Sequence, residues 1–166
     1  MNQVGLFLLL AIAAGATLDM LFVGLNTFFN KFVQEIQDAI DANPGRSILI
    51  GLINALFFLA IGYLLVAWAQ SAGLALIGLV GVLFWLALTL GLVFGLTGMV
   101  LSARARLTPG EETWRSLAAA GAILILASLT PYLGWFLFFP YLLLRGLGGI
   151  VIHLQTAYRR RGSEGE

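Results

Sequence analysis

Two side chains of opposite charge, Asp19 and Arg145, stand inside apolar segments long enough to cross a bilayer. A charge held at bilayer depth costs roughly 2.5–3.5 kcal/mol on insertion scales, so it usually faces protein, water or an opposite charge. We therefore expect an intramembrane Asp19–Arg145 ion pair. The alternatives are separate pairing with other subunits or backbone carbonyls, and a proton relay. A last helix that ended at Leu144 would instead place Arg145 at the cytoplasmic surface.

No other group of residues has the pattern of a reactive site. The chain has one histidine, His153, and no cysteine, whereas a metal site needs several convergent ligands. Phosphate-binding loops, nucleophile elbows and zinc-protease motifs are also absent from the sequence. We therefore expect a protein that is not an enzyme, with no catalytic residue, no metal, no cofactor and no nucleic-acid partner, and we assign no cofactor-binding residue.

The composition indicates an all-α, polytopic integral membrane bundle that forms a single domain, residues 1–166. Hydrophobic residues make up 60% of the chain and charged residues 10%, and the mean hydropathy is +0.98. Roughly 20 apolar helical residues cross a bilayer, whereas open sheet edges do not occur in lipid. We predict three full spans and a helical hairpin broken between Pro131 and Gly134, at about 4–29, 48–69, 73–101, 115–130 and 134–157. The alternative is four spans with a re-entrant element in that hairpin.

The basic residues predict the orientation, because short loops rich in Lys and Arg stay in the cytoplasm. The turns at 70–72 and 131–134 carry no charge. An outside N-terminus and a cytoplasmic C-terminus place every basic residue except Arg145 in inside segments: Lys31, Arg46, Arg104, Arg106, Arg115, Arg159, Arg160 and Arg161. We expect a bacterial cytoplasmic, or photosynthetic, membrane.

The segment 28–42 has the periodicity of an amphipathic helix, which the sequence Asn43-Pro44-Gly45 ends. We expect it to lie flat on the cytoplasmic membrane interface or, as the alternative, to dock a partner subunit. Its acidic polar face favours the partner somewhat, because helices that bind anionic lipid are usually basic. The apolar face consists of Phe28, Phe29, Phe32, Val33, Ile36 and Ile40.

A second local signal lies between the third and fourth apolar segments. Thr108, Pro109 and Glu111 have the spacing of a capping box with proline at the first helical position. We expect a helix to begin there, with Trp114 at the membrane interface.

Small residues recur at helical spacing on two predicted spans. Such stripes let helix backbones approach closely in lipid. We expect these positions to pack helices within the chain, with subunit association as the alternative: Gly51, Gly62, Gly91, Gly95 and Gly98.

Three short motifs resemble a known membrane region: Asn43-Pro44-Gly45-Arg46-Ser47, the turn 129–135 (LTPYLGW) and Leu147-Gly148-Gly149. Between about Asn43 and Gly149 the chain is similar to the multipass region of bactofilin-like, polymer-forming bacterial membrane proteins. The β-rich polymer-forming domain of those proteins has no counterpart in residues 1–166. The resemblance therefore implies a helical membrane module that anchors or scaffolds, and it carries over no catalytic residue.

These observations favour a non-enzymatic membrane scaffold or an accessory subunit of a larger membrane complex. Its partners would be membrane lipid and other membrane protein subunits. The alternative is a small homo-oligomeric channel or transporter, since the broken hairpin around Pro131 is typical of transporter helices.

Overall fold

Helices account for nearly all of the chain that the computed structural model describes, which is residues 3–163, with only the backbone described at residues 4, 7, 8 and 160–163. This confirms the all-α architecture, and residues 3–163 contain no strand. The elements are α1 (Gln3–Phe28), α2 (Asn30–Ala42), α3 (Pro44–Ala72), α4 (Ala75–Leu107), α5 (Trp114–Ser128), the π-helical turn η1 (Gly134–Phe138) and α6 (Phe139–Ser163).

Within the described residues, four helical stretches are long and apolar enough to cross a membrane. They are Leu9–Phe28, Pro44–Ala72, Ala75–Leu107 and Gly134–Arg159. α5 has 15 residues, fewer than the roughly 20 that a perpendicular crossing needs. The chain is therefore a multipass membrane protein in which α5 is the short arm of the final hairpin.

Local residue chemistry sets the ends of α3. Pro44 lies in its first turn, where a missing backbone N–H leaves no hydrogen bond unmade. Gly73 follows its last residue with a φ of 68°, and its backbone N–H donates to the Ala69 carbonyl. The turn between α3 and α4 is therefore Gly73-Leu74, and the predicted turn at 70–72 is still helical.

The predicted helix start at Thr108 is wrong. Thr108 follows the last residue of α4, and its backbone N–H donates to the Arg104 carbonyl over 2.9 Å. α5 begins six residues later, where Thr113 Oγ1 accepts a hydrogen bond from the Ser116 N–H over 3.2 Å. α4 continues past the predicted end at 101, and Thr108 therefore ends α4 instead of starting α5.

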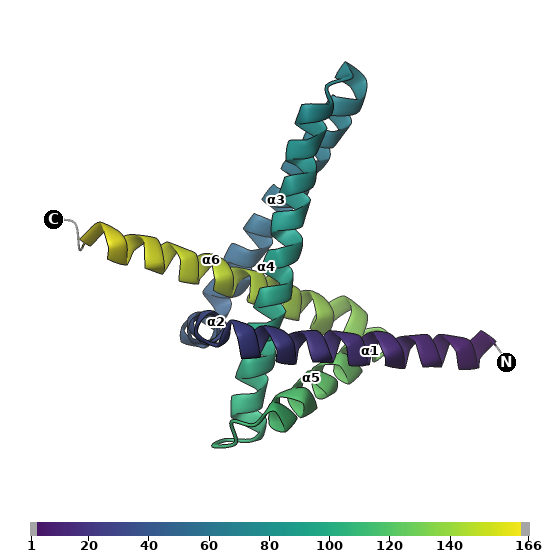
Figure 1. Cartoon of the computed structure of the whole chain (residues 1–166), viewed down its shortest axis with the longest axis vertical. Helices are drawn as coiled ribbons and strands as arrows, with labels where there is room; N and C mark the ends of the chain where they lie inside the picture. Colours follow the sequence, from purple (N-terminus) through teal and green to yellow (C-terminus); the bar gives the residue numbers. More distant parts are fainter. Residues whose placement is uncertain (1–2, 164–166) are drawn as a thin grey trace.

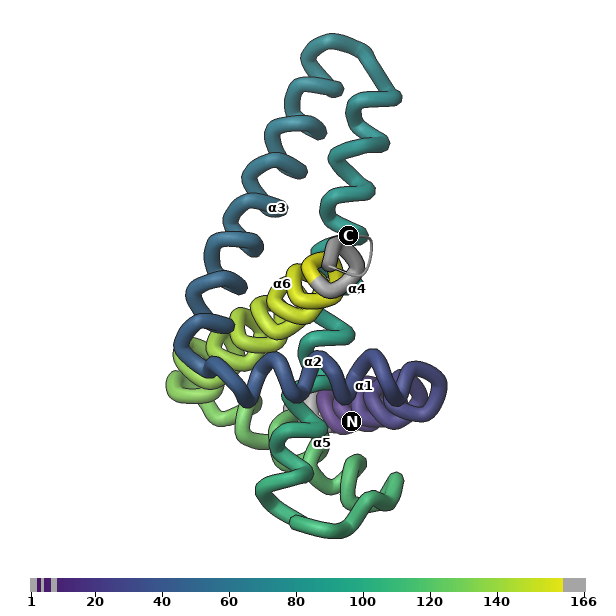
Figure 2. The backbone as a smooth tube through the Cα atoms, turned by 90° about the vertical axis from the view of Figure 1, so that its left-hand side faces the viewer, coloured from purple at the N-terminus to yellow at the C-terminus, as the bar shows by residue number. Residues whose placement is uncertain are grey.

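α6 crosses the α3–α4 hairpin instead of running along it, and α1 also lies across α4 (Figures 1 and 2). Glycines make the α6 crossing possible. Gly148 lies against the backbone of Ser47 in α3, and a β-carbon at Gly146 would come within 2.7 Å of the Gly95 carbonyl carbon in α4. Without side chains at these positions the helix backbones pack directly on one another.

The buried core lies around this crossing. One cluster joins α1, α2, α4 and α5 and comprises Phe22, Val33, Val100, Leu101, Leu117 and Ala120. The other joins α2, α4 and α6 and comprises Ile36, Ile40, Met99, Leu142 and Ile150.

The apolar face of α2 is part of that core, which corrects the predicted role of this helix. Val33, Ile36 and Ile40 have no exposed area at all, because Val33 lies in the first of these clusters and Ile36 and Ile40 in the second. They therefore face neither lipid nor another subunit. Phe32 packs edge-on against Phe94 of α4, with 5.4 Å between ring centroids. Phe28 and Phe29 remain exposed, at 84% and 51%.

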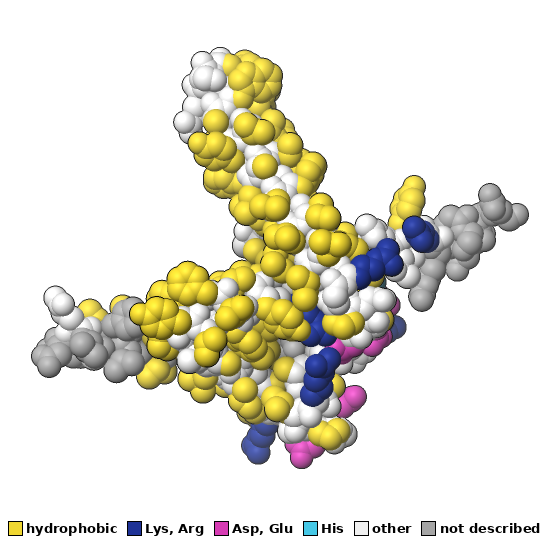
Figure 3. Space-filling view, turned by 180° about the vertical axis from the view of Figure 1, so that it is seen from behind, with side chains coloured by type: hydrophobic (Ala, Val, Ile, Leu, Met, Phe, Trp, Pro, Cys, Tyr) yellow, Lys and Arg dark blue, Asp and Glu magenta, His cyan; other side chains and the backbone are white. Residues whose placement is uncertain are grey.

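The outer part of the α3–α4 hairpin projects away from the core (Figures 1 and 2). There Gly62 packs against the Trp85 ring, and Gly81 against Val66. Apolar side chains cover this projection. On the face in Figure 3 the described charged side chains lie near the crossing, on the arm at the right and at the lower end of the molecule. The surface thus has an apolar part and a charged part.

Candidate functional site

One carboxylate, Asp41 at the end of α2, joins three helices. Its Oδ1 accepts a hydrogen bond from the Ser102 hydroxyl over 2.7 Å and from Arg106 Nη2 over 2.9 Å, both on α4. The same oxygen lies 3.4 Å from Arg145 Nη2 on α6. Because Ser102 and Arg106 are one helical turn apart, they present their donors on the same face of α4. Asp41 therefore ties α2, α4 and α6 together.

Arg145 is the buried member of this cluster, with 5% of its surface exposed. Its Nη1 donates to the hydroxyl of Tyr141, one turn earlier on α6, and its guanidinium carbon lies 5.7 Å from the centroid of the Tyr141 ring. Its Nε has no hydrogen-bond partner in the described residues. The carboxylate and the aromatic ring together offset the cost of burying the charge.

The predicted Asp19–Arg145 pair is not formed. Asp19 lies on α1 against Gly121 of α5, where a β-carbon would overlap the carboxylate. Its Oδ1 is buried and accepts no hydrogen bond from the described residues. The two charges are separated because α6 crosses the molecule and takes Arg145 to Asp41 at the end of α2. The alternative end at Leu144 is also wrong, because α6 continues through Arg145 to Ser163.

Sequence reasoning missed Asp41 as a site residue. It was assigned to the polar side of α2, and it follows the buried Ile40 directly. Its hydrogen-bond donors lie 61, 65 and 104 residues further along the chain. The pair Ser102 and Arg106 at helical spacing is a signal that a carboxylate faces α4, but no local pattern identifies which carboxylate.

His153 has a separate environment. Its Nε2 lies 3.5 Å from Glu35 Oε2, and its ring packs edge-on against Phe32 with 5.2 Å between centroids. This contact links α6 to the polar side of α2. Within the described residues, no three His, Asp or Glu side chains converge as metal ligands would.

All five glycines predicted to pack helices lie against another helix of the same chain. Gly51 lies on the Leu144 carbonyl, Gly95 on Gly146, and Gly62 on Trp85. A β-carbon at Gly91 would lie 3.0 Å from Leu147, and one at Gly98 would lie 2.7 Å from Ile36. These positions therefore serve contacts within the chain.

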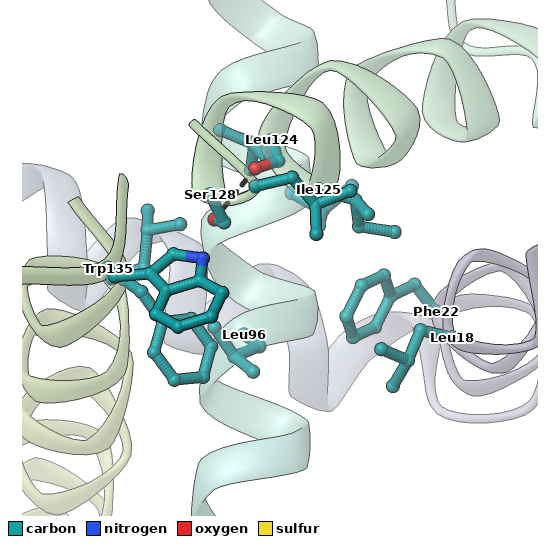
Figure 4. A pocket seen from close by; sticks show the side chains of 11 residues that line it. Leu18, Phe22, Leu96, Leu124, Ile125, Ser128 and Trp135 are labelled. Atoms are coloured by element: carbon teal, nitrogen blue, oxygen red, sulfur yellow. Dashed lines mark hydrogen bonds between the residues drawn. The ribbon is translucent and has the colours of Figure 1, made fainter. Parts of the chain in front are cut away.

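An apolar cavity of about 440 Å³ opens between α1, α4, α5 and the start of α6. In Figure 4 Trp135 and Leu96 lie on one side of it, and Leu18 and Phe22 on the other. The Ser128 hydroxyl on its wall donates to the Leu124 carbonyl over 2.8 Å. The wall therefore offers an apolar contact surface to a ligand, with few polar groups left to form hydrogen bonds.

A second cavity of about 300 Å³ is polar and lies where the C-terminal ends of α1 and α4 meet the starts of α2 and α5. Charged and amide side chains line it together with Trp114. The complete lining is Val23, Asn26, Thr27, Asn30, Gln34, Arg104, Glu112, Thr113, Trp114 and Leu117.

Comparison of the chain with protein-family models, with curated proteins and with solved structures found no match in any of the three. The geometry described above is therefore what supports a function for this membrane protein.

Proposed function

We propose that this chain is a non-enzymatic integral membrane protein that scaffolds a larger membrane assembly or serves as its accessory subunit. The observation that carries the proposal is the outer α3–α4 hairpin, which packs on itself and leaves large aromatic and aliphatic side chains exposed over its length. Among these are Phe57, Tyr63 and Trp68, each more than half exposed. Such a projecting arm offers two free sides to the helices of other subunits.

The polar residues of the core support the same proposal. Asp41, Ser102, Arg106, Arg145 and Tyr141 bond to one another and tie three helices together. Each of these side chains makes at least one structural contact within the chain. The glycine crossing makes the same region close-packed, and a rigid base of this kind holds the projecting hairpin in a defined direction.

We propose a bacterial cytoplasmic, or photosynthetic, membrane, and the basic residues support an N-terminus outside and a C-terminus in the cytoplasm. Because α5 is too short to cross alone, this orientation requires α5 and the turn 129–133 together to return the chain to the outer side before α6. The turn Gly73-Leu74 carries no charge, whereas the connection between α4 and α5 lies next to Arg104, Arg106 and Arg115. Reporter fusions at residues 1 and 166 test this orientation. We expect the two reporters to report opposite sides, and two cytoplasmic ends would contradict it.

One observation favours a second candidate, a small homo-oligomeric channel or transporter. Asp19 is a carboxylate within a membrane-crossing stretch, and its Oδ1 has no hydrogen-bond partner in the described residues. Ionisable residues at such depth often mark ion or proton pathways.

Mild detergent extraction followed by mass spectrometry of the intact complex separates the two candidates. A scaffold or accessory subunit co-purifies with a fixed, stoichiometric set of different membrane proteins. Photo-crosslinkers at Phe57 and Trp68 should react with those same subunits, whereas one at the buried Ile36 should not. A homo-oligomer that conducts ions in liposomes, and loses conductance on Asp19→Asn, would overturn the first proposal in favour of the second.

A further inference from the structure

The polar cavity carries two opposite charges. Arg104 of α4 and Glu112 of the α4–α5 connection both line it, and neither forms an ion pair with the described residues. Asn26 of α1 also lines it. Glu112 is exposed and Arg104 is partly exposed, so both charges are accessible to a ligand that carries the complementary charges.

The apolar cavity lies deeper along the same three helices. On α1 its wall ends at Phe22, and the polar wall includes Asn26, four residues or about 6 Å further along the helix. On α4, Val100 lines the apolar cavity, and Arg104, also four residues further along, lines the polar one. The polar cavity is therefore at the ends of the membrane-crossing helices and the apolar one at the depth of acyl chains, with the packed Phe22 and Leu117 between them.

We infer that the polar cavity binds the headgroup of a phospholipid that carries both a phosphate and a primary ammonium, as phosphatidylethanolamine does. Arg104 donates hydrogen bonds to the phosphate. The ammonium has three N–H donors, which match the Glu112 carboxylate. Trp114 on the rim lies where aromatic side chains commonly meet lipid headgroups. An acyl chain of the same lipid reaches the depth of the apolar cavity.

The charges discriminate among headgroups. Phosphatidylglycerol also offers a phosphate to Arg104, but its uncharged glycerol leaves the Glu112 carboxylate without a cation. Phosphatidylcholine is zwitterionic, but its quaternary ammonium has no N–H to donate to the Glu112 carboxylate. The cavity therefore favours the primary ammonium over both. This inference goes beyond the proposed function and requires only that the chain lies in a lipid membrane.

The test is a titration of the full chain in mild detergent with the three phospholipids, matched in acyl chains, with bound lipid counted by mass spectrometry of the intact protein. We expect phosphatidylethanolamine to bind about tenfold more tightly than either of the others, which is the effect of one charge-assisted hydrogen bond. Arg104→Gln should weaken its binding about tenfold. Glu112→Gln should remove the preference over phosphatidylglycerol.

Matched controls keep the result specific. Two residues that do not line the cavity serve as controls. Glu111→Gln changes the carboxylate next to Glu112, and Arg46→Gln changes an exposed arginine. Both should bind phosphatidylethanolamine as the unchanged chain does. Circular dichroism shows whether each variant keeps its helices. Equal binding of the three lipids, or the same effect from Glu111→Gln and Glu112→Gln, would overturn the inference. Equally tight binding of soluble glycerophosphoethanolamine would overturn the assignment to a lipid.

Discussion

Asp41→Asn tests whether one carboxylate holds three helices together. Asparagine has nearly the same shape, so the change removes the charge and leaves one carbonyl oxygen as acceptor. Arg145 then keeps the Tyr141 hydroxyl as its hydrogen-bond partner and loses its counter-ion. Ser102 and Arg106, which already share Oδ1, keep an acceptor at that place, but a neutral one that accepts more weakly. We expect the fold to survive with a lower free energy of unfolding.

The contacts set the size of the effect. The pair with Arg106, which is 63% exposed, contributes about 0–1 kcal/mol. The Ser102 hydrogen bond contributes about 1 kcal/mol. Stranding a fully buried partner costs about 3–5 kcal/mol, but the Asp41 side chain is 34% exposed, so water compensates part of this. We therefore expect Asp41→Asn to lower the free energy of unfolding by about 2–3 kcal/mol.

The assay is unfolding of the purified chain in mixed micelles by a denaturing detergent, followed by circular dichroism. Asp38→Asn is the matched control, because Asp38 is an exposed carboxylate on the same helix, and we expect a change within about 0.5 kcal/mol. The double variant Asp41→Asn, Arg145→Gln should regain about 1 kcal/mol or more relative to the sum of the single changes, because no charge is then stranded. Equal losses for Asp38→Asn and Asp41→Asn, or a strictly additive double variant, would refute the role assigned to Asp41.

Three further predictions concern packing. Gly148→Ala should reduce the yield of folded protein far more than Gly62→Ala, because the first β-carbon meets the α3 backbone and the second meets a side chain that moves; size-exclusion profiles of the two variants measure this, and equal profiles would contradict it. Gly121→Ala should lower the free energy of unfolding by about 1–3 kcal/mol through its overlap with Asp19. Adding Asp19→Ala should restore most of that loss, and an additive double variant would exclude the contact. Ile36→Asp should destabilise the purified chain by more than the roughly 1.5–3 kcal/mol of apolar burial that it removes, because it also buries a charge. Unchanged unfolding would mean that α2 is not part of the core.

Much of the secondary structure was predictable, because it depends on residues close together in the sequence. The apolar runs indicate the long helices, the Asn43-Pro44-Gly45 sequence separates α2 from α3, and the segment around Pro131 breaks the last hairpin. The glycines that permit close helix contacts were also recognisable from their spacing. Helix ends were less predictable: α3 continues to Ala72 and α4 to Leu107, because apolar periodicity does not specify which of several polar residues ends a helix.

Only the tertiary structure decided which partners these elements meet. By composition alone, the apolar face of α2 would fit lipid, another subunit or its own chain equally well. In the structure α6 crosses the molecule, and α4 and α6 pack on this face. The same crossing takes Arg145 to Asp41 instead of Asp19. In a membrane the hydrophobic effect does not select among helix neighbours. The choice depends on where glycine backbones fit and where a donor meets an acceptor, and these matches join residues up to 104 positions apart.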